Sequence, residues 1–243
     1  MSLGSIVAAH ALSGAAIAGA TSDLPKKFQS APYSRMSLSV GYPNDGSQVR
    51  AKRLKPSKYV KLKPGSEGKS YGHPALVLML ERSAKELQRA ATGSVLVVGD
   101  LSDANGGPLS GHRSHQSGRD ADVAFYVLDE NGKQIVLDHY VKFDAHGKAL
   151  DGSGYVFDDW RNWLLVESWV RDRRAGLSHI FISRPLRQRL ISYASKQPAF
   201  RQYVPEVSAL LKQPEEGEPH DDHFHVRVSC PKEQSEICRE QSK

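Results

Sequence analysis

The segment Asp222-His-Phe-His-Val-Arg-Val-Ser229 alternates polar and apolar side chains from His223 onward. Successive side chains of a strand point to opposite faces, so this pattern predicts a half-buried strand. His223 and His225 would then share the polar face. The core face would carry the apolar residues Phe224, Val226 and Val228. A His-x-His pair alone is a weak indication of a metal site, because such pairs also occur on solvated strands.

A second polar cluster lies in Ser110-Gly-His-Arg-Ser-His-Gln-Ser-Gly-Arg-Asp-Ala-Asp122. If a strand begins near Ala121, Asp120 and Asp122 share one of its faces. A loop histidine that folds back over this carboxylate, with Gly118 permitting the turn, supplies two ligands. One histidine from the strand over 222–229 completes three. The pattern alone leaves open which histidines and which aspartate bind.

Three nitrogen and oxygen ligands leave the fourth position of a tetrahedral site free for water, as in catalytic zinc centres. Nitrogen donors with a single carboxylate also suit zinc better than calcium or magnesium. The alternative is that both clusters are solvated polar residues on a loop and an edge strand. Two such clusters, each beside a well-patterned strand, favour the metal site.

Other segments carry the periodicity of helices or strands. We expect helices over 73–91, 160–174 and 185–196, an interrupted helix over 199–212, and strands over 94–99, 121–128, 134–143 and 179–183. Asp129-Glu-Asn-Gly132 is a strong hairpin-turn signal between two of these strands. Helices mixed with hairpin-connected strands predict an α+β fold with a small antiparallel sheet, flanked by helices.

The 243 residues suffice for a single domain with a real core, expected over 38–243. Residues 1–20 are small and apolar and end in Ala18-Gly-Ala20, although no Lys or Arg precedes Lys26. They are interpreted as a degenerate or clipped signal peptide, with a disordered leader as the alternative. Residues 21–37 are expected to be a linker. We expect no transmembrane helix, because no other apolar run approaches 18 residues.

The chain has 33 basic and 27 acidic residues, a formal net charge of +6. This charge suits an anionic polymer such as nucleic acid or bacterial cell wall. The basic residues are spread from Lys26 to Lys243 without a nucleic-acid module, which argues against nucleic-acid binding. Cys230 and Cys238 are too few for a four-cysteine zinc site. They would form a small disulfide loop in an exported protein, or two thiols in a cytosolic one.

Three motifs together resemble the penicillin-insensitive murein endopeptidases. They are Val97-Val-Gly-Asp-Leu-Ser102 running into Gly106-Gly-Pro108, then Ser110–Gly118, then His220-Asp-Asp-His-Phe-His-Val-Arg227 followed by Cys230-Pro231. The similarity extends from about Leu38, through Tyr71-Gly-His-Pro74, to Cys238. This family belongs to the LAS group, with lysostaphin-type enzymes, D-Ala-D-Ala peptidases and hedgehog domains. The resemblance therefore implies a small antiparallel sheet that carries one Zn²⁺ ion.

The resemblance also assigns roles that spacing leaves open. The group's His-x6-Asp motif falls on His115 and Asp122, and the later histidine of its His-x-His motif, His225, completes the zinc ligands. The earlier one, His223, becomes the general base or transition-state stabiliser, for which a near-neutral pKa is expected. Further residues are placed around them: His220 in catalysis and His112 and Asp120 as lining or supporting groups.

The implied activity is hydrolysis of the peptide cross-links of peptidoglycan, at the D-alanyl–diaminopimelate or a related bond, by metal-activated water. The implied location is the periplasm of an exporting cell. Two alternatives stay open. One is a D,D-carboxypeptidase or dipeptidase of the same group, and the other is a non-catalytic, zinc-containing module that binds the wall.

Overall fold

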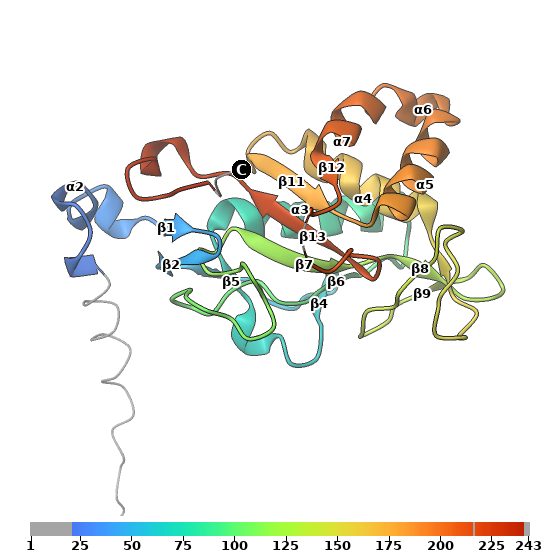
Figure 1. Cartoon of the computed structure of the whole chain (residues 1–243), viewed down its shortest axis with the longest axis horizontal. Coiled ribbons are helices and arrows are strands. Elements are labelled where there is room, and N and C mark those ends of the chain that lie inside the picture. Colours follow the sequence, from blue (N-terminus) through green and yellow to red (C-terminus); the bar gives the residue numbers. More distant parts are fainter. Residues whose placement is uncertain (1–20, 216, 241–243) are drawn as a thin grey trace, which may run out of the picture.

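The computed structural model describes residues 21–215 and 217–240, which are organised around one six-stranded sheet (Figure 1). The signal peptide or leader expected over 1–20 lies outside these described residues. The sheet is made of β4 (Val60–Leu62), β6 (Leu96–Val98), β7 (Asp120–Ala124), β11 (Leu177–Phe181), β12 (Leu211–Lys212) and β13 (His223–Val228). Their spatial order is β12-β11-β13-β7-β6-β4.

The centre of the sheet is antiparallel, because β13 pairs antiparallel with β11 and β7, and β7 with β6. The two outer pairs are parallel, β4 with β6 and β11 with β12. The expectation of an antiparallel sheet is therefore correct at the centre and wrong at both edges. Parallel strands need a crossover. The helix over 74–90 supplies one of them, and the helices over 184–210 supply the other.

All the helices but the short α2 lie where periodicity predicts them, and the α+β class is confirmed. They are α3 (Pro74–Ala90), α4 (Asp159–Arg171), α5 (Arg184–Ser195), α6 (Pro198–Arg201) and α7 (Val204–Leu210), with a short α2 (Lys26–Gln29) near the start. The expected helix over 199–212 is broken as its proline indicates, since Pro205 falls in the first turn of α7. Figure 1 shows α5, α6 and α7 gathered beside β11 and β12.

The two faces of the central strands differ in character. Phe224, Val226, Ala121 and Val123 are fully buried and join one core cluster with apolar residues of α3 and α4. Trp169 of α4 packs edge-on against Phe224, with ring centroids 5.7 Å apart. The opposite face carries the histidines and aspartates. The alternation of the sequence thus separates a packing face from a polar face.

Three smaller sheets flank this unit. They pair β1 (Leu38–Tyr42) with β2 (Asp45–Val49), β3 (Lys52–Arg53) with β5 (Tyr71–Gly72), and β8 (Val127–Leu128) with β9 (Gln134–Ile135) and β10 (Val156–Phe157). The hairpin turn over 129–132 is confirmed, because it joins the antiparallel strands β8 and β9. The strand expected over 134–143 ends at Ile135, after which the chain leaves the sheet and turns back toward the polar face.

The two ends of the described chain pack together. In the segment expected to be a linker, Leu24 and Phe28 are buried against Leu38, Val49 and Ile237. Three 3₁₀ turns complete the elements: η1 (Tyr33–Arg35), η2 (Glu67–Lys69) and η3 (Lys232–Gln234). The expected Cys230–Cys238 disulfide is present, and the loop it closes is hydrogen bonded to β1.

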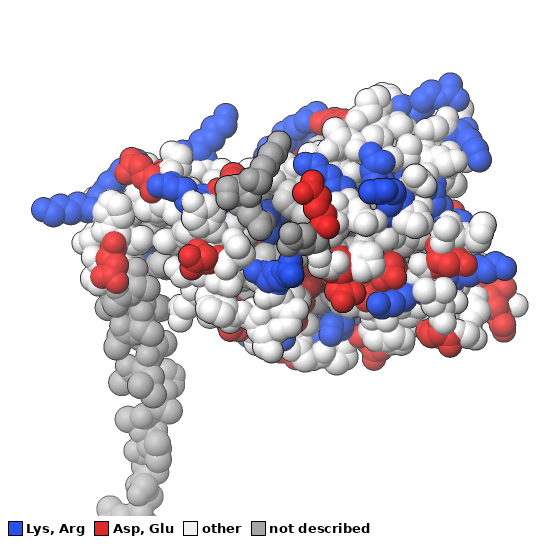
Figure 2. Space-filling view, in the orientation of Figure 1, with Lys and Arg blue, Asp and Glu red and all other residues white. Residues whose placement is uncertain are grey.

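Charge is mixed over the surface. On the face drawn in Figure 2, Lys and Arg side chains are interspersed with Asp and Glu. Among residues 21–215 and 217–240, no helix combines the length and apolar character that crossing a membrane requires.

One prediction concerns His73, the N-cap of α3, whose Nδ1 accepts a hydrogen bond from Ala75 N at 3.2 Å. Burial lowers the pKa of His73 from 6.5 to about 4. Between these values the unfolded chain binds a proton that the folded chain does not, so the free energy of unfolding falls as the pH falls. We expect His73 to contribute a loss of about 1–2 kcal/mol between pH 7 and pH 5.

The measurement is urea unfolding at both pH values for the wild type and for His73→Ser. Serine retains a capping oxygen but does not titrate. The decrease between pH 7 and pH 5 should therefore be smaller in this variant. Equal decreases in both proteins would contradict the prediction.

Candidate metal centre

The candidate centre is built on the pairing of β7 with β13. The register places Asp122 directly opposite His225 and Asp120 opposite Arg227. Side chains that face each other across an antiparallel pair lie within contact distance. The pairing therefore brings the two aspartates at the end of the 110–122 segment against His225 and Arg227 of the 222–229 segment.

Asp122 is the focus of the cluster. Its Oδ1 lies 3.1 Å from His225 Nδ1, 3.3 Å from His115 Nε2 and 3.5 Å from His223 Nε2. This oxygen is buried and accepts no hydrogen bond from any of the described residues. A buried carboxylate oxygen without a donor is costly unless a cation compensates it. The geometry thus favours a bound cation among these groups.

His115 is held so that one ring nitrogen is free to bind. Its Nδ1–H donates to the Leu101 carbonyl at 2.6 Å, and its Nε2 is buried with no hydrogen-bond partner in 21–215 or 217–240. The residue has a φ of 72°, a conformation that is unfavourable outside glycine. Its carbonyl accepts a hydrogen bond from the Ser102 hydroxyl. These contacts with Leu101 and Ser102 hold the imidazole ring of His115 so that its Nε2 faces Asp122.

His225 is oriented by Asp120. His225 Nε2–H donates to Asp120 Oδ1 at 2.8 Å, and Arg227 Nε donates to the same oxygen at 2.5 Å. Burial alone would raise the pKa of Asp120, but Arg227 and His225 hold it well below its usual range. An ionised Asp120 directs His225 Nδ1 toward Asp122. Hydrogen bonds of this kind commonly orient metal-binding histidines.

His112 lies on the other side of Asp122. Its Nδ1 is 3.5 Å from Asp122 Oδ2, and its Nε2 is 3.0 Å from Asp100 Oδ2. Potential ligand atoms of His112, His115 and Asp122 all lie within 4.8 Å of one another. His112, expected to line the site, is thus also placed to act as a ligand.

His223 stands beside the cluster and is held by its neighbour in sequence. Its Nδ1–H donates to Asp222 Oδ1 at 2.5 Å. The ring stacks on Tyr140, with centroids 4.6 Å apart and planes inclined by 19°. Its Nε2 is left facing Asp122. The expected catalytic histidine is therefore fixed both in direction and in plane.

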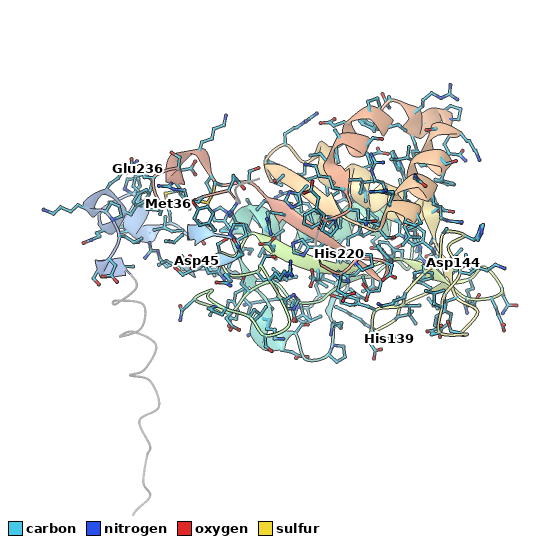
Figure 3. The ribbon with its side chains drawn as sticks, in the orientation of Figure 1. Met36, Asp45, His139, Asp144, His220 and Glu236 are labelled. Carbon is cyan, nitrogen blue, oxygen red and sulfur yellow. A yellow bond between two sulfur atoms is a disulfide. The ribbon has the colours of Figure 1, made fainter. Side chains whose placement is uncertain are left out.

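His220 lies in the loop that leads into β13, with its ring centroid 5.0 Å from that of His223 and 5.5 Å from that of His225 (Figure 3). Its φ of 57° is a second unfavourable backbone conformation at the centre. Burial lowers the pKa of His220 to about 4, and the two neighbouring histidines contribute to the decrease. His220 is therefore neutral at physiological pH.

The charges of the cluster depend on one another. Burial alone would raise the pKa of Asp122, but His115 and His223 hold it well below its usual range. For His223, burial lowers the pKa, but the carboxylates of Asp122 and Asp222 outweigh it and raise the value to about 10. This differs from the near-neutral pKa expected. The difference arises from the uncompensated charge of Asp122, which a cation would neutralise.

Three residues of the centre were not predicted as site residues from the sequence. Asp100 binds His112 and also accepts hydrogen bonds from Ser66 Oγ at 2.6 Å and Lys69 Nζ at 2.9 Å. Asp222 accepts a hydrogen bond from His223, and the Tyr140 ring stacks on the His223 imidazole. Asp100 directly follows a predicted strand and lies within the Val97–Ser102 motif, and this position was the available signal. Tyr140 lies in a segment expected to be a strand, and no signal in the sequence placed it in the centre.

Comparison with known proteins gives a consistent result. Residues 39–243 match the sequence model of a family described as penicillin-insensitive murein endopeptidase. Relatives of that name in Salmonella paratyphi B (strain ATCC BAA-1250 / SPB7), Salmonella newport (strain SL254) and Salmonella enteritidis PT4 (strain P125109) are each 28% identical over 174 residues. The alignment covers 70% of this chain and 58% of each relative.

The chain therefore spans little more than half the length of these relatives. The family match nevertheless includes both central strands and every side chain of the centre described above. On the extent of this match, the chain belongs to the penicillin-insensitive murein endopeptidase family.

Proposed function

We propose that the protein is a zinc-dependent endopeptidase that hydrolyses the peptide cross-links of peptidoglycan, at the D-alanyl–diaminopimelate or a related bond. The observation that carries this proposal is Asp122 Oδ1, which is buried and within 3.5 Å of three histidine nitrogens, with no hydrogen bond from the described part of the chain. The names of the relatives support the substrate class. Within the LAS group, we assign the six-stranded sheet to the hedgehog-like type.

We propose that His115, Asp122 and His225 hold one Zn²⁺ ion. We prefer His225 over His112 because its Nδ1 faces the same Asp122 oxygen as His115 Nε2, whereas His112 faces the other oxygen. Two nitrogens and one carboxylate suit zinc and leave a position for water. Bound zinc would lower the pKa of that water and polarise the scissile carbonyl.

The side chains around the ion would transfer the proton, orient the base and support the transition state. Once the charge of Asp122 is compensated, His223 loses the main cause of its raised pKa and can accept a proton from water. It would return that proton to the leaving amine. Asp222 keeps Nδ1–H in place, so Nε2 is the atom that exchanges the proton. Neutral His220 borders the same space and supports the transition state.

We also propose that the protein is exported to the periplasm. The Cys230–Cys238 disulfide supports this, because disulfides persist in oxidising compartments and are rare in the cytosol. Peptidoglycan as the partner is consistent with the net charge of +6.

The proposed activity predicts the products of digesting purified sacculi. We expect cross-linked dimers to be lost and monomers to accumulate, as read by mass spectrometry. A chelator should abolish the reaction, and added zinc should restore it. Loss of terminal D-Ala alone would identify a carboxypeptidase instead. Intact sacculi in the presence of zinc would favour the non-catalytic wall-binding module.

The proposed ligand set predicts which variants retain the metal. His115→Ala and His225→Ala should lose bound zinc on dialysis, because each removes one of three ligands. His112→Ala is the matched control and should retain close to one zinc per chain. Metal is measured by elemental analysis, with circular dichroism to confirm folding. Zinc lost by His112→Ala but kept by His225→Ala would show that His112 is the ligand.

The role of His223 predicts a metal-dependent titration. In metal-free protein its imidazole should stay protonated above pH 8, since Asp122 and Asp222 raise its pKa to about 10. Zinc should move the titration toward neutrality, because metal binding and proton release are coupled. NMR of the imidazole measures both. His223→Ala should keep zinc yet lose about 100-fold or more in kcat. An unchanged kcat would remove His223 from the mechanism.

A further inference from the structure

Tyr140 enters the centre from the irregular segment that follows β9. The segment over 136–143 carries exposed residues at 136, 138 and 139 before Tyr140 turns inward. Its ring covers one face of the His223 imidazole, and Lys63 Nζ lies 5.4 Å from its centroid. The aromatic ring therefore limits rotation of His223 about its side chain, while Asp222 limits its direction.

The hydroxyl of Tyr140 lies deeper than its ring. The oxygen is buried and has no hydrogen-bond partner among the described residues. It occupies the space above Gly99, where a Cβ on residue 99 would overlap it. Gly99 N donates to Asp122 O at 2.8 Å, so the hydroxyl stands beside the strand position that carries Asp122. The glycine provides the room that brings the phenol next to the proposed zinc ligand.

A buried hydroxyl without a partner is unfavourable relative to a satisfied one, because it has lost its hydrogen bonds to water. Buried polar side chains with no partner are uncommon and often mark sites of function. At neutral pH a phenol keeps its proton and can donate a hydrogen bond. The Tyr140 hydroxyl therefore has an unused donor position beside Gly99, next to the strand that carries Asp122.

We propose that Tyr140 is a catalytic residue, whose hydroxyl donates a hydrogen bond to the oxygen of the scissile carbonyl while its ring positions His223. The assignment rests on the proposed peptidase function. As a water oxygen adds to the carbonyl carbon, negative charge develops on the carbonyl oxygen. A donor fixed in a buried site stabilises that charge without reorganisation, so its effect falls mainly on kcat.

The chain offers a matched control in Tyr126. Its hydroxyl is also buried and has no partner within the described ranges, but its ring lies against Arg161, whose guanidinium carbon is 4.9 Å from the centroid. Tyr126 thus shares the burial of Tyr140 without the contact to His223. Comparing Tyr140→Phe with Tyr126→Phe separates a role in the reaction from the general effect of deleting a buried hydroxyl.

The experiment measures sacculus cleavage, zinc content and the NMR titration of His223 in both variants. We expect Tyr140→Phe to lower kcat by about 10- to 100-fold with little change in KM, because phenylalanine retains the stacking. Its zinc content and His223 titration should match the wild type, and Tyr126→Phe should retain wild-type kcat. A wild-type kcat in Tyr140→Phe would overturn the proposal. So would zinc loss in that variant, or equal losses of activity in both.

A binding measurement separates this proposal from the proposed function. A phosphinate analogue of the D-alanyl–diaminopimelate bond presents tetrahedral oxygens where the carbonyl oxygen would lie. Tyr140→Phe should bind it about 10-fold or more weakly than the wild type in calorimetry, and Tyr126→Phe should bind it equally well. If wild-type protein leaves sacculi intact, the proposed function fails. Equal affinity of wild type and Tyr140→Phe for the analogue overturns the role of Tyr140.

Discussion

The register between β7 and β13 is the constraint on which the centre depends. It sets Asp122 against His225 on one face and Val123 against Phe224 on the other. Because side chains alternate, a slip of one residue would carry the histidines into the core and the apolar residues into the polar layer. The packing of Phe224 against α4 therefore helps to hold the register on which the candidate metal centre depends.

Burial of charge is the second constraint. Asp120 and Asp122 are almost fully buried, and each keeps its charge only because cationic groups surround it. Asp120 Oδ1 accepts hydrogen bonds from Arg227 Nε and His225 Nε2, while Asp120 Oδ2 is buried without a partner among the described residues. Asp122 Oδ1 is buried in the same way, but it faces nitrogens of three histidines. The two aspartates therefore differ in their neighbours: a guanidinium holds Asp120, whereas imidazoles that can bind a metal surround Asp122.

Loops complete the polar face, and two of their residues adopt unfavourable backbone conformations. His115 and His220 both adopt left-handed backbone conformations, one in the loop before β7 and one in the loop before β13. Such conformations persist where surrounding contacts hold them. The segment after β9 adds Tyr140 from a third direction. The strands thus carry Asp122, His223 and His225. The loops place His115, His220 and Tyr140 around them.

Local chemistry in the sequence determined much of this arrangement. Alternation over 222–229 and the hairpin turn after β8 depend on near neighbours, so they could be predicted. The patterns also predicted that a loop histidine, an aspartate and a histidine of the last strand meet. The family resemblance selected His115, Asp122 and His225 among the candidates. Only the tertiary structure decided the parallel edges of the sheet, the contact between Asp100 and His112, and the place of Tyr140 over Gly99. These depend on segments distant in sequence that meet through crossovers and loop closure, for which no local pattern exists.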